Sequence, residues 1–231
     1  MQVRDAFWWT MVTLVVTVLF FEWTDVDVAL QNHLFDQVAR RWLIDAQAPL
    51  PRLFFYNGVK WLLIAIGSAV VLGWLATFAV KSIRPQRKRL LFLILCMGLI
   101  PLAVAAGKRL SNVFCPADLI IYGGDKPYVR LLEPMPQTVT EEGRCWPAGH
   151  ASGGFSLMGL FFLCNSRRHR NLGLGAGLLF GWLMGAYQMA KGAHFLSHTL
   201  VTMELAWLMA LGFYAMLYRG WRTPLAKARC E

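Results

Sequence analysis

Residues 7–22, FWWTMVTLVVTVLFFE, form a largely apolar stretch near the start of the chain. A helix that crosses the hydrocarbon core of a bilayer needs about 20 apolar residues. The stretch lacks a small-x-small cleavage site and is followed by further apolar stretches, so we interpret it as a membrane anchor and not as a signal peptide. The other stretches lie at 60–80, 90–107, 152–165, 172–190 and 199–218, of which 152–165 is short.

The composition agrees with this pattern. Of the 231 residues, 57% are hydrophobic, and the mean hydropathy is +0.45. This is more apolar than an ordinary soluble domain. We therefore expect an all-α polytopic membrane protein with about six transmembrane helices, organised as a single membrane domain over residues 1–231.

Basic residues account for the net charge of +10, and they gather in short segments at 81–89, 167–170 and 219–229. These segments alternate with the remaining connections as the positive-inside rule requires. We therefore expect both termini and both basic loops on the cytoplasmic side of a bacterial inner membrane. This distribution favours orientation signals over nucleic-acid binding. The periplasmic side then receives residues 23–59, 108–151 and 191–198.

Two further features fall on the periplasmic side. Residues 28–43 predict an amphipathic interfacial helix, because apolar residues recur at helical spacing: Leu30, Leu34, Val38 and Trp42. We expect this helix to cap the bundle, with a lipid-gathering role as the alternative. Residues 108–151 are rich in proline and glycine, which predicts a long irregular loop of functional importance.

Chemistry-bearing residues gather at three membrane boundaries on this side. The three segments are KRLSNVFCP at 108–116, CWPAGHASGG at 145–154 and QMAKGAHFLSH at 188–198. In the last segment, Lys191, His194 and His198 would lie on one stripe of a helix. A phosphate group bound there would meet histidines and cations together, which suits phosphoryl transfer.

His150 precedes the fourth predicted span, where the first backbone N–H groups of a helix are unpaired and favour an anion. Lys108 and Arg109 end the third span on the same side. The turn thus brings an imidazole to the height at which a lipid holds its phosphate.

The three segments resemble the motifs of the type 2 phosphatidic acid phosphatase superfamily, which are K-x6-R-P, then P-S-G-H, then S-R-x5-H-x3-D. The resemblance covers about residues 60–218, and the matching positions are Lys108, Pro116, Pro147, Gly149, His150 and His194. Four positions depart from the pattern. The chain has Cys115 and Gln188 in place of arginines, Ala148 in place of a serine and His198 in place of an aspartate.

The resemblance implies a metal-independent membrane phosphatase without a cofactor. His194 would attack phosphorus to form a phosphohistidine, and His150 would protonate the leaving oxygen. Lys108 and the amide of Gly149 would hold the phosphoryl oxygens. The expected partner is a phosphorylated membrane lipid, such as a polyprenyl diphosphate, phosphatidylglycerol phosphate, phosphatidic acid or a lipid A phosphate.

Compensation for the four departures is expected from residues near the site. Lys191 lies one turn from Gln188 and would restore a positive charge, although without the bidentate fork of arginine. Ser152 would supply the missing hydroxyl, and His198 would accept a hydrogen bond from His194. Further cations are available at Arg109 and Arg144.

The five cysteines predict one disulfide. Cys96 and Cys164 lie in or at the ends of predicted spans, and Cys230 lies in the cytoplasmic tail. Only Cys115 and Cys145 fall on the periplasmic side, where disulfides persist. We expect these two to be bridged, which would hold Lys108 near His150; two free thiols are the alternative.

Other classes of function fit less well. His194 and His198 have the i, i+4 spacing of zinc ligands, with His150 as a third, but no carboxylate accompanies them. A transporter would carry ionisable groups within its spans, whereas these spans are nearly free of them. A phosphotransferase using the same residues and a catalytically degenerate relative remain the alternatives to a phosphatase.

Overall fold

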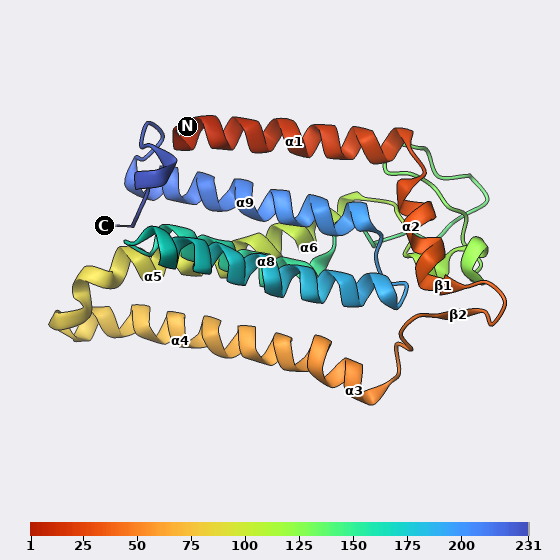
Figure 1. The fold of residues 1–231 in the computed structure, drawn as a ribbon, viewed down its shortest axis with the longest axis horizontal. Coiled ribbons are helices and arrows are strands. Elements are labelled where there is room, and N and C mark those ends of the chain that lie inside the picture. Colours follow the sequence, from red (N-terminus) through yellow and green to blue (C-terminus); the bar gives the residue numbers. More distant parts are fainter. Residues whose placement is uncertain (231) are drawn as a thin grey trace.

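The computed structural model describes residues 1–230 as a bundle of helices (Figure 1). Within this range, four helices are long and apolar enough to cross a membrane: Val3–Trp23, Pro49–Ala79, Lys81–Leu110 and Leu196–Tyr218. The first is α1 (Val3–Trp23) and the last is α9 (Leu196–Tyr218). The second joins α3 (Pro49–Pro51), the π-helical segment η1 (Arg52–Gly58) and α4 (Val59–Ala79). The third joins η2 (Lys81–Gln86), α5 (Arg87–Ile94), η3 (Leu95–Leu99) and α6 (Ile100–Leu110).

Four of the six predicted spans are thus confirmed as apolar helices of sufficient length. The prediction at 152–165 corresponds to α7 (Gly149–Ser156) and the 3-10 segment η6 (Leu157–Phe162), which together are shorter than a bilayer core. The prediction at 172–190 lies within α8 (Arg167–Ala190), which begins on a polar turn and is rich in glycine. Six membrane crossings are therefore not established.

Glycine residues let α7 and α8 pack against each other at the centre of the bundle. A Cβ atom on Gly181 would lie 2.1 Å from Cδ1 of Phe155, so only glycine fits at this crossing. Phe155 is fully buried, together with Phe92 and Phe162 from the neighbouring helices. The core therefore lies around α7, while α4 stands at the margin of the bundle (Figure 1).

The predicted interfacial helix at 28–43 is wrong in its second half. Helix α2 (Val26–Leu34) ends where a short hairpin begins, formed by β1 (Phe35–Asp36) and β2 (Arg41–Trp42). The rings of Phe35 and Trp42 pack on Tyr122, with centroids 5.3 and 5.1 Å from its ring. Val38, expected on the apolar stripe, is 96% exposed at the hairpin tip. Burial of aromatic rings against a distant loop thus overrides the helical period.

The irregular loop that follows α6 contains two 3-10 turns, η4 (Pro116–Asp118) and η5 (Ile120–Tyr122). This loop lies at the same end of the bundle as α2 and the hairpin, and the two termini lie at the other end (Figure 1). The C-terminal tail, with its 3-10 turn η7 (Leu225–Lys227), returns to the first helix, where Val3 donates to the carbonyl of Thr223 at 2.9 Å. The molecule therefore has one end rich in loops and one end that holds both termini.

Candidate active site

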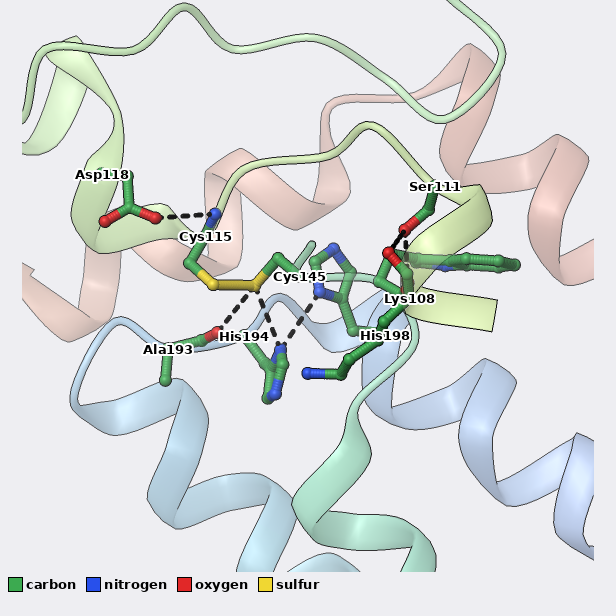
Figure 2. Close-up of a disulfide and its surroundings, with 9 residues drawn as sticks. Lys108, Ser111, Cys115, Asp118, Cys145, Ala193, His194 and His198 are labelled. Carbon is green, nitrogen blue, oxygen red and sulfur yellow. Dashed lines mark hydrogen bonds between the residues drawn. A yellow bond between two sulfur atoms is a disulfide. The ribbon is translucent and has the colours of Figure 1, made fainter. Parts of the chain in front are cut away.

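Three segments distant in sequence meet at the end of the bundle that carries the loops (Figure 2). The end of α6 provides Lys108, the turn before α7 provides Cys145, and the connection between α8 and α9 provides His194. The predicted disulfide joins Cys115 to Cys145, with their Cα atoms 5.1 Å apart. The bridge therefore ties the loop after α6 to the turn that precedes His150.

His194 and His198 lie side by side in the interior, each 2% exposed. Nδ1 of His194 is 3.4 Å from Nδ1 of His198 and 3.3 Å from Sγ of Cys145 (Figure 2). The disulfide sulfur carries no hydrogen, so its approach to His194 is a van der Waals or weak acceptor contact. Burial lowers the pKa of His194 well below its usual range, and the charges of nearby histidine and lysine groups lower it further. His194 is consequently neutral at physiological pH.

The predicted single helical stripe through Lys191, His194 and His198 does not form. Helix α8 ends at Ala190, and α9 begins at Leu196. Between them Gly192 has φ 77°, and a Cβ atom there would lie 2.3 Å from Cε2 of Trp42. A turn that requires glycine thus brings the two histidines together in place of a continuous helix.

His150 is the second residue of α7, and its Nε2 shares a 3.0 Å hydrogen bond with Oη of Tyr56. Nδ1 of His150 is buried without a hydrogen-bond partner in the described part of the chain. The ring centroids of His150 and His194 are 6.4 Å apart. Burial and the charges of Lys108, Lys191 and Lys60 lower the pKa of His150 to about 4.

The predicted cations differ in their relation to these rings. Lys108 extends toward His194 (Figure 2), and its Cε would lie 3.1 Å from a Cβ atom on Gly149. Nζ of Lys191 lies over the rings of Tyr56 and Tyr187, at 5.2 and 5.1 Å from their centroids. Glycine at position 149 therefore leaves room for the Lys108 side chain.

Other predicted residues are placed less favourably for a direct role. Arg109 is exposed, and successive residues of a helix point about 100° apart, so it diverges from Lys108. Arg144 is exposed and pairs with Glu142 at 3.0 Å. The hydroxyl of Ser152 donates to the carbonyl of Gly149 at 2.6 Å, within the helix.

Gln188 is 1% exposed, and neither its side-chain nitrogen nor its side-chain oxygen has a hydrogen-bond partner within residues 1–230. A buried amide without partners costs free energy unless a bound group satisfies it. The residue that stands where the third motif has an arginine is thus a buried, unsatisfied donor in the last turn of α8.

A groove of about 740 Å³ runs from His150 along α4. Tyr56 and Lys60 line it beside His150, and further along its walls are mostly apolar, with Leu63, Ile64, Val71, Leu72 and Met97. Its polar part thus coincides with the turn of α7, and its apolar part follows a helix long enough to cross a membrane. Such a shape suits an amphiphile with a charged head.

Two residues beside the candidate site were absent from the sequence prediction, and both come from residues 23–59. Tyr56 contacts His150, as described above. Asp27, 5% exposed on α2, accepts a hydrogen bond from the backbone N–H of Ser197 at 2.9 Å. Burial raises the pKa of Asp27 to about 6, although its hydrogen bonds act in the opposite direction. No local motif marks either residue, because each acts through contacts with distant parts of the chain.

A metal site fits this arrangement poorly. Cys145, His194 and His198 place ligand atoms within 4.8 Å of one another. The sulfur of Cys145 is bonded to Cys115, however, and a metal would need a thiolate. His150, the third ligand expected from the sequence, is not among this group, and its Nε2 is hydrogen-bonded to Tyr56. Two imidazoles then remain, fewer than the three protein ligands of a catalytic zinc site.

Comparison with known proteins gives one match. The family model of the PAP2 superfamily matches residues 89–222, from α5 to the tail beyond α9. This range includes Lys108, His150, His194 and the disulfide. No curated protein and no solved structure matches the chain.

Proposed function

The chain belongs to the PAP2 superfamily, and on that premise we propose that it is a phosphatase acting on the phosphate or diphosphate headgroup of a membrane lipid. Activity of the phosphatase or phosphotransferase type is what the family supports at the coarse level. The observation that carries the finer proposal is the groove, which joins an apolar channel along α4 to His150. A lipid would keep its chains beside α4 while its phosphate reached the histidines.

The phosphate site would be formed by groups that now lack partners or counter-charges. Nδ1 of His150 and the side-chain amide of Gln188 are buried without hydrogen-bond partners in the described structure. Lys108 and Lys191 supply positive charge near both histidines, as their influence on the pKa of His150 and of His194 indicates. A phosphoryl group would satisfy these donors and cations together.

In the proposed mechanism, Nε2 of His194 attacks phosphorus, and an N–P bond forms as the P–O bond to the lipid breaks. His150 gives its proton to the departing oxygen, through the nitrogen that has no partner in the resting structure. Neutral His150 then accepts a proton from water, whose oxygen attacks phosphorus and releases His194 and phosphate. Each step uses residues of this chain alone.

The proposed location is the periplasmic face of a bacterial inner membrane. The basic loop 81–89 joins α4 to α5, at the same end of the bundle as the two termini (Figure 1). By the positive-inside rule that end would be cytoplasmic, and the site at the opposite end would face the periplasm. In this arrangement α8 and the pair of α7 and η6 would complete six crossings, with most of α7 shielded from lipid by the other helices.

The decisive experiment is phosphate release by the purified protein from four lipids: a polyprenyl diphosphate, phosphatidylglycerol phosphate, phosphatidic acid and lipid A. We expect at least one lipid to be hydrolysed. We expect His194→Ala to reduce the rate by about 10³-fold or more, because it removes the nucleophile. The matched control is His169→Ala, since His169 is exposed in the first turn of α8 at the far end of the bundle.

Turnover by His194→Ala that approaches the wild-type value would refute the proposed nucleophile. An inactive wild-type protein on all four lipids would favour a catalytically degenerate relative. Transfer of labelled phosphate to an added lipid acceptor, in place of release to water, would identify a phosphotransferase.

A further inference from the structure

The groove along α4 carries one cation that the proposed mechanism does not use. Lys60 lines the groove together with Tyr56 and His150. We propose that Lys60 forms a second anion subsite, which binds the phosphate nearest the lipid chain and makes a diphosphate lipid the preferred substrate over a monophosphate. This inference rests on the proposed function, because it identifies the substrate class of that same site. Lys60 lies outside residues 89–222, so the family match itself assigns it no role.

Lys60 lies between His150 and the apolar part of the groove. Tyr56 marks the level of His150, because its hydroxyl shares the 3.0 Å hydrogen bond with Nε2 of that ring. Lys60 follows Tyr56 by four residues, about one helical turn further from the end of the bundle that carries the loops (Figure 1). The apolar wall begins at Leu63, within the next turn of α4. A lipid in the groove would therefore pass Lys60 with the group that joins its reacting phosphate to its chain.

The surroundings of Lys60 leave its charge without a counter-ion. Among the described residues up to position 230, it has no ion-pair or hydrogen-bond partner. None of those residues that line the groove carries a carboxylate. Lysines near the ends of membrane helices commonly extend to the lipid headgroups, but this lysine belongs to the wall of the groove itself. An anionic group of the substrate at this level would supply the missing counter-charge.

The group that would reach Lys60 differs between the candidate lipids. In a diphosphate lipid it is a second phosphate, which is negatively charged. In phosphatidic acid it is a neutral glycerol ester, and in a polyprenyl monophosphate it is already hydrocarbon. Phosphatidylglycerol phosphate also has a second phosphate, but a glycerol separates it from the terminal one and would carry it past Lys60 to the apolar wall. The position of Lys60 therefore favours two adjacent phosphates.

A diphosphate also suits the state of His150. Nε2 of His194 would attack the terminal phosphorus, and an N–P bond forms as the bond from that phosphorus to the bridging oxygen breaks. The electron pair stays on the bridging oxygen, so a lipid monophosphate leaves beside Lys60. A phosphate monoester, with its second pKa of about 6, is a much weaker base than the alkoxide that leaves from a monophosphate. Its departure depends less on a proton from His150, whose pKa of about 4 leaves it mostly neutral at pH 7.

The test compares two substrates that share one chain, farnesyl diphosphate and farnesyl phosphate, on the purified protein at one pH. We expect kcat/KM to be at least about 10-fold higher for the diphosphate. Lys60→Ala should lower kcat/KM for the diphosphate by about 10- to 100-fold and for the monophosphate by less than about 3-fold. Lys60→Arg should keep most of the preference. The matched control is Arg41→Ala, which removes an exposed cation of β2 at the same end of the bundle (Figure 1) and should leave the ratio unchanged.

A binding measurement tests the inference whatever the turnover. Calorimetry on the wild type should show tighter binding of the methylenediphosphonate analogue of farnesyl diphosphate than of farnesyl phosphonate, and Lys60→Ala should lose this difference. Equal affinity for the two analogues, a substrate ratio near one in the wild type, or a ratio that Lys60→Ala leaves unchanged would overturn the inference. An equal loss of phosphatidylglycerol phosphate turnover in Lys60→Ala would also overturn it, because Lys60 would then not distinguish adjacent phosphates from separated ones.

Failure of the subsite and failure of the proposed function give different results. An active wild type without a preference for the diphosphate would refute the subsite and leave the phosphatase intact. An inactive wild type that still binds the diphosphonate preferentially through Lys60 would refute the phosphatase and support the subsite.

Discussion

At the scale of single residues, the sequence marks His150 and His194 as candidates, because each lies in a short motif at a predicted membrane boundary. Tyr56 and Asp27 could not, because their roles arise from contacts with residues about 90 and 170 positions away in the chain. The compensation expected at Lys191 is also only partly visible in sequence. Its ammonium lies over two tyrosine rings, an arrangement that depends on how η1 and α8 pack.

The pKa of His150 gives a prediction for the pH profile. As a general acid, His150 must be protonated, so kcat/KM should fall as pH rises through its pKa of about 4 in the free protein. Lys60 is one of the cations that lower this pKa. Lys60→Ala should therefore raise the pKa and move the descending limb to higher pH.

The measurement is kcat/KM against pH for wild type, Lys60→Ala and Lys81→Ala, with one substrate throughout so that its own ionisation is common to all. Lys81 is exposed in η2 at the other end of the bundle and should leave the profile unchanged. A profile for Lys60→Ala that coincides with wild type, or moves to lower pH, would contradict the assignment of His150 as the acid.

At the scale of elements, the positions of the long helices along the chain can be predicted from hydropathy. The conformation of the connection that carries His194 cannot. The turn in this connection requires glycine at position 192, because a Cβ atom there would overlap the ring of Trp42. Helix α2 makes a hydrogen bond at each end of the connection. Gln31 donates to the carbonyl of Met189 at 2.9 Å, and Asp27 accepts from Ser197. The periodicity of the sequence predicts the apolar face of α2 but not these two buried polar contacts. For this reason residues 28–43 are predicted only as an interfacial cap.

Asp27 yields a prediction about stability. Its pKa in the folded protein is about 6, above the usual aspartate value of 3.8, so the folded state binds the proton more tightly than the unfolded state. Stability should therefore rise by about 1 kcal/mol as pH falls from 7 to 5, toward a limit of about 3 kcal/mol that is reached only below the unfolded-state pKa. Asp27→Asn should remove this dependence while it keeps an acceptor for Ser197.

Thermal unfolding in detergent at pH 5 and pH 7 provides the check. Asp27→Ala should melt at a lower temperature than Asp27→Asn at both values, because it loses the acceptor. Asp25→Asn is the control, since Asp25 is exposed two residues away. A difference in Tm between pH 5 and pH 7 that Asp27→Asn keeps in full would show that another group is responsible.

At the scale of the whole molecule, the sequence predicts a helical membrane protein with its chemistry at one end, and the fold has this polarity (Figure 1). Four spans could be counted from hydropathy. The region of α7 and α8 could not be resolved in the same way, because glycines that allow close packing also lower the apolar character of a segment. The disulfide could be predicted because charge and hydropathy give an expected compartment for each cysteine.

Removal of this bridge should affect both stability and activity. The cysteines are 30 residues apart, and closure of such a loop contributes roughly 3–4 kcal/mol by the loop-entropy estimate. The double variant Cys115→Ser, Cys145→Ser should therefore melt earlier and turn over more slowly. Reductant should impair the wild type in the same way and leave the double variant unaffected.

Mass spectrometry after alkylation establishes whether reduction was complete in each sample. Cys164→Ser, which changes a partly buried free cysteine, is the matched control and should respond to reductant as the wild type does. Full activity of a wild-type sample in which both thiols are alkylated would show that the bridge has no part in holding the site.

The groove along α4 has a consequence for how rates should be described. Its wall residues Ile64, Val71 and Leu72 are 45%, 41% and 65% exposed, so the groove is open along the side that would face lipid. A substrate arriving there diffuses in two dimensions within one leaflet. The quantity that governs encounter is then its mole fraction in the bilayer or micelle. At a constant bulk concentration of substrate, addition of an inert amphiphile should slow the reaction. Addition of water should not, because it leaves the mole fraction of substrate in the bilayer or micelle unchanged.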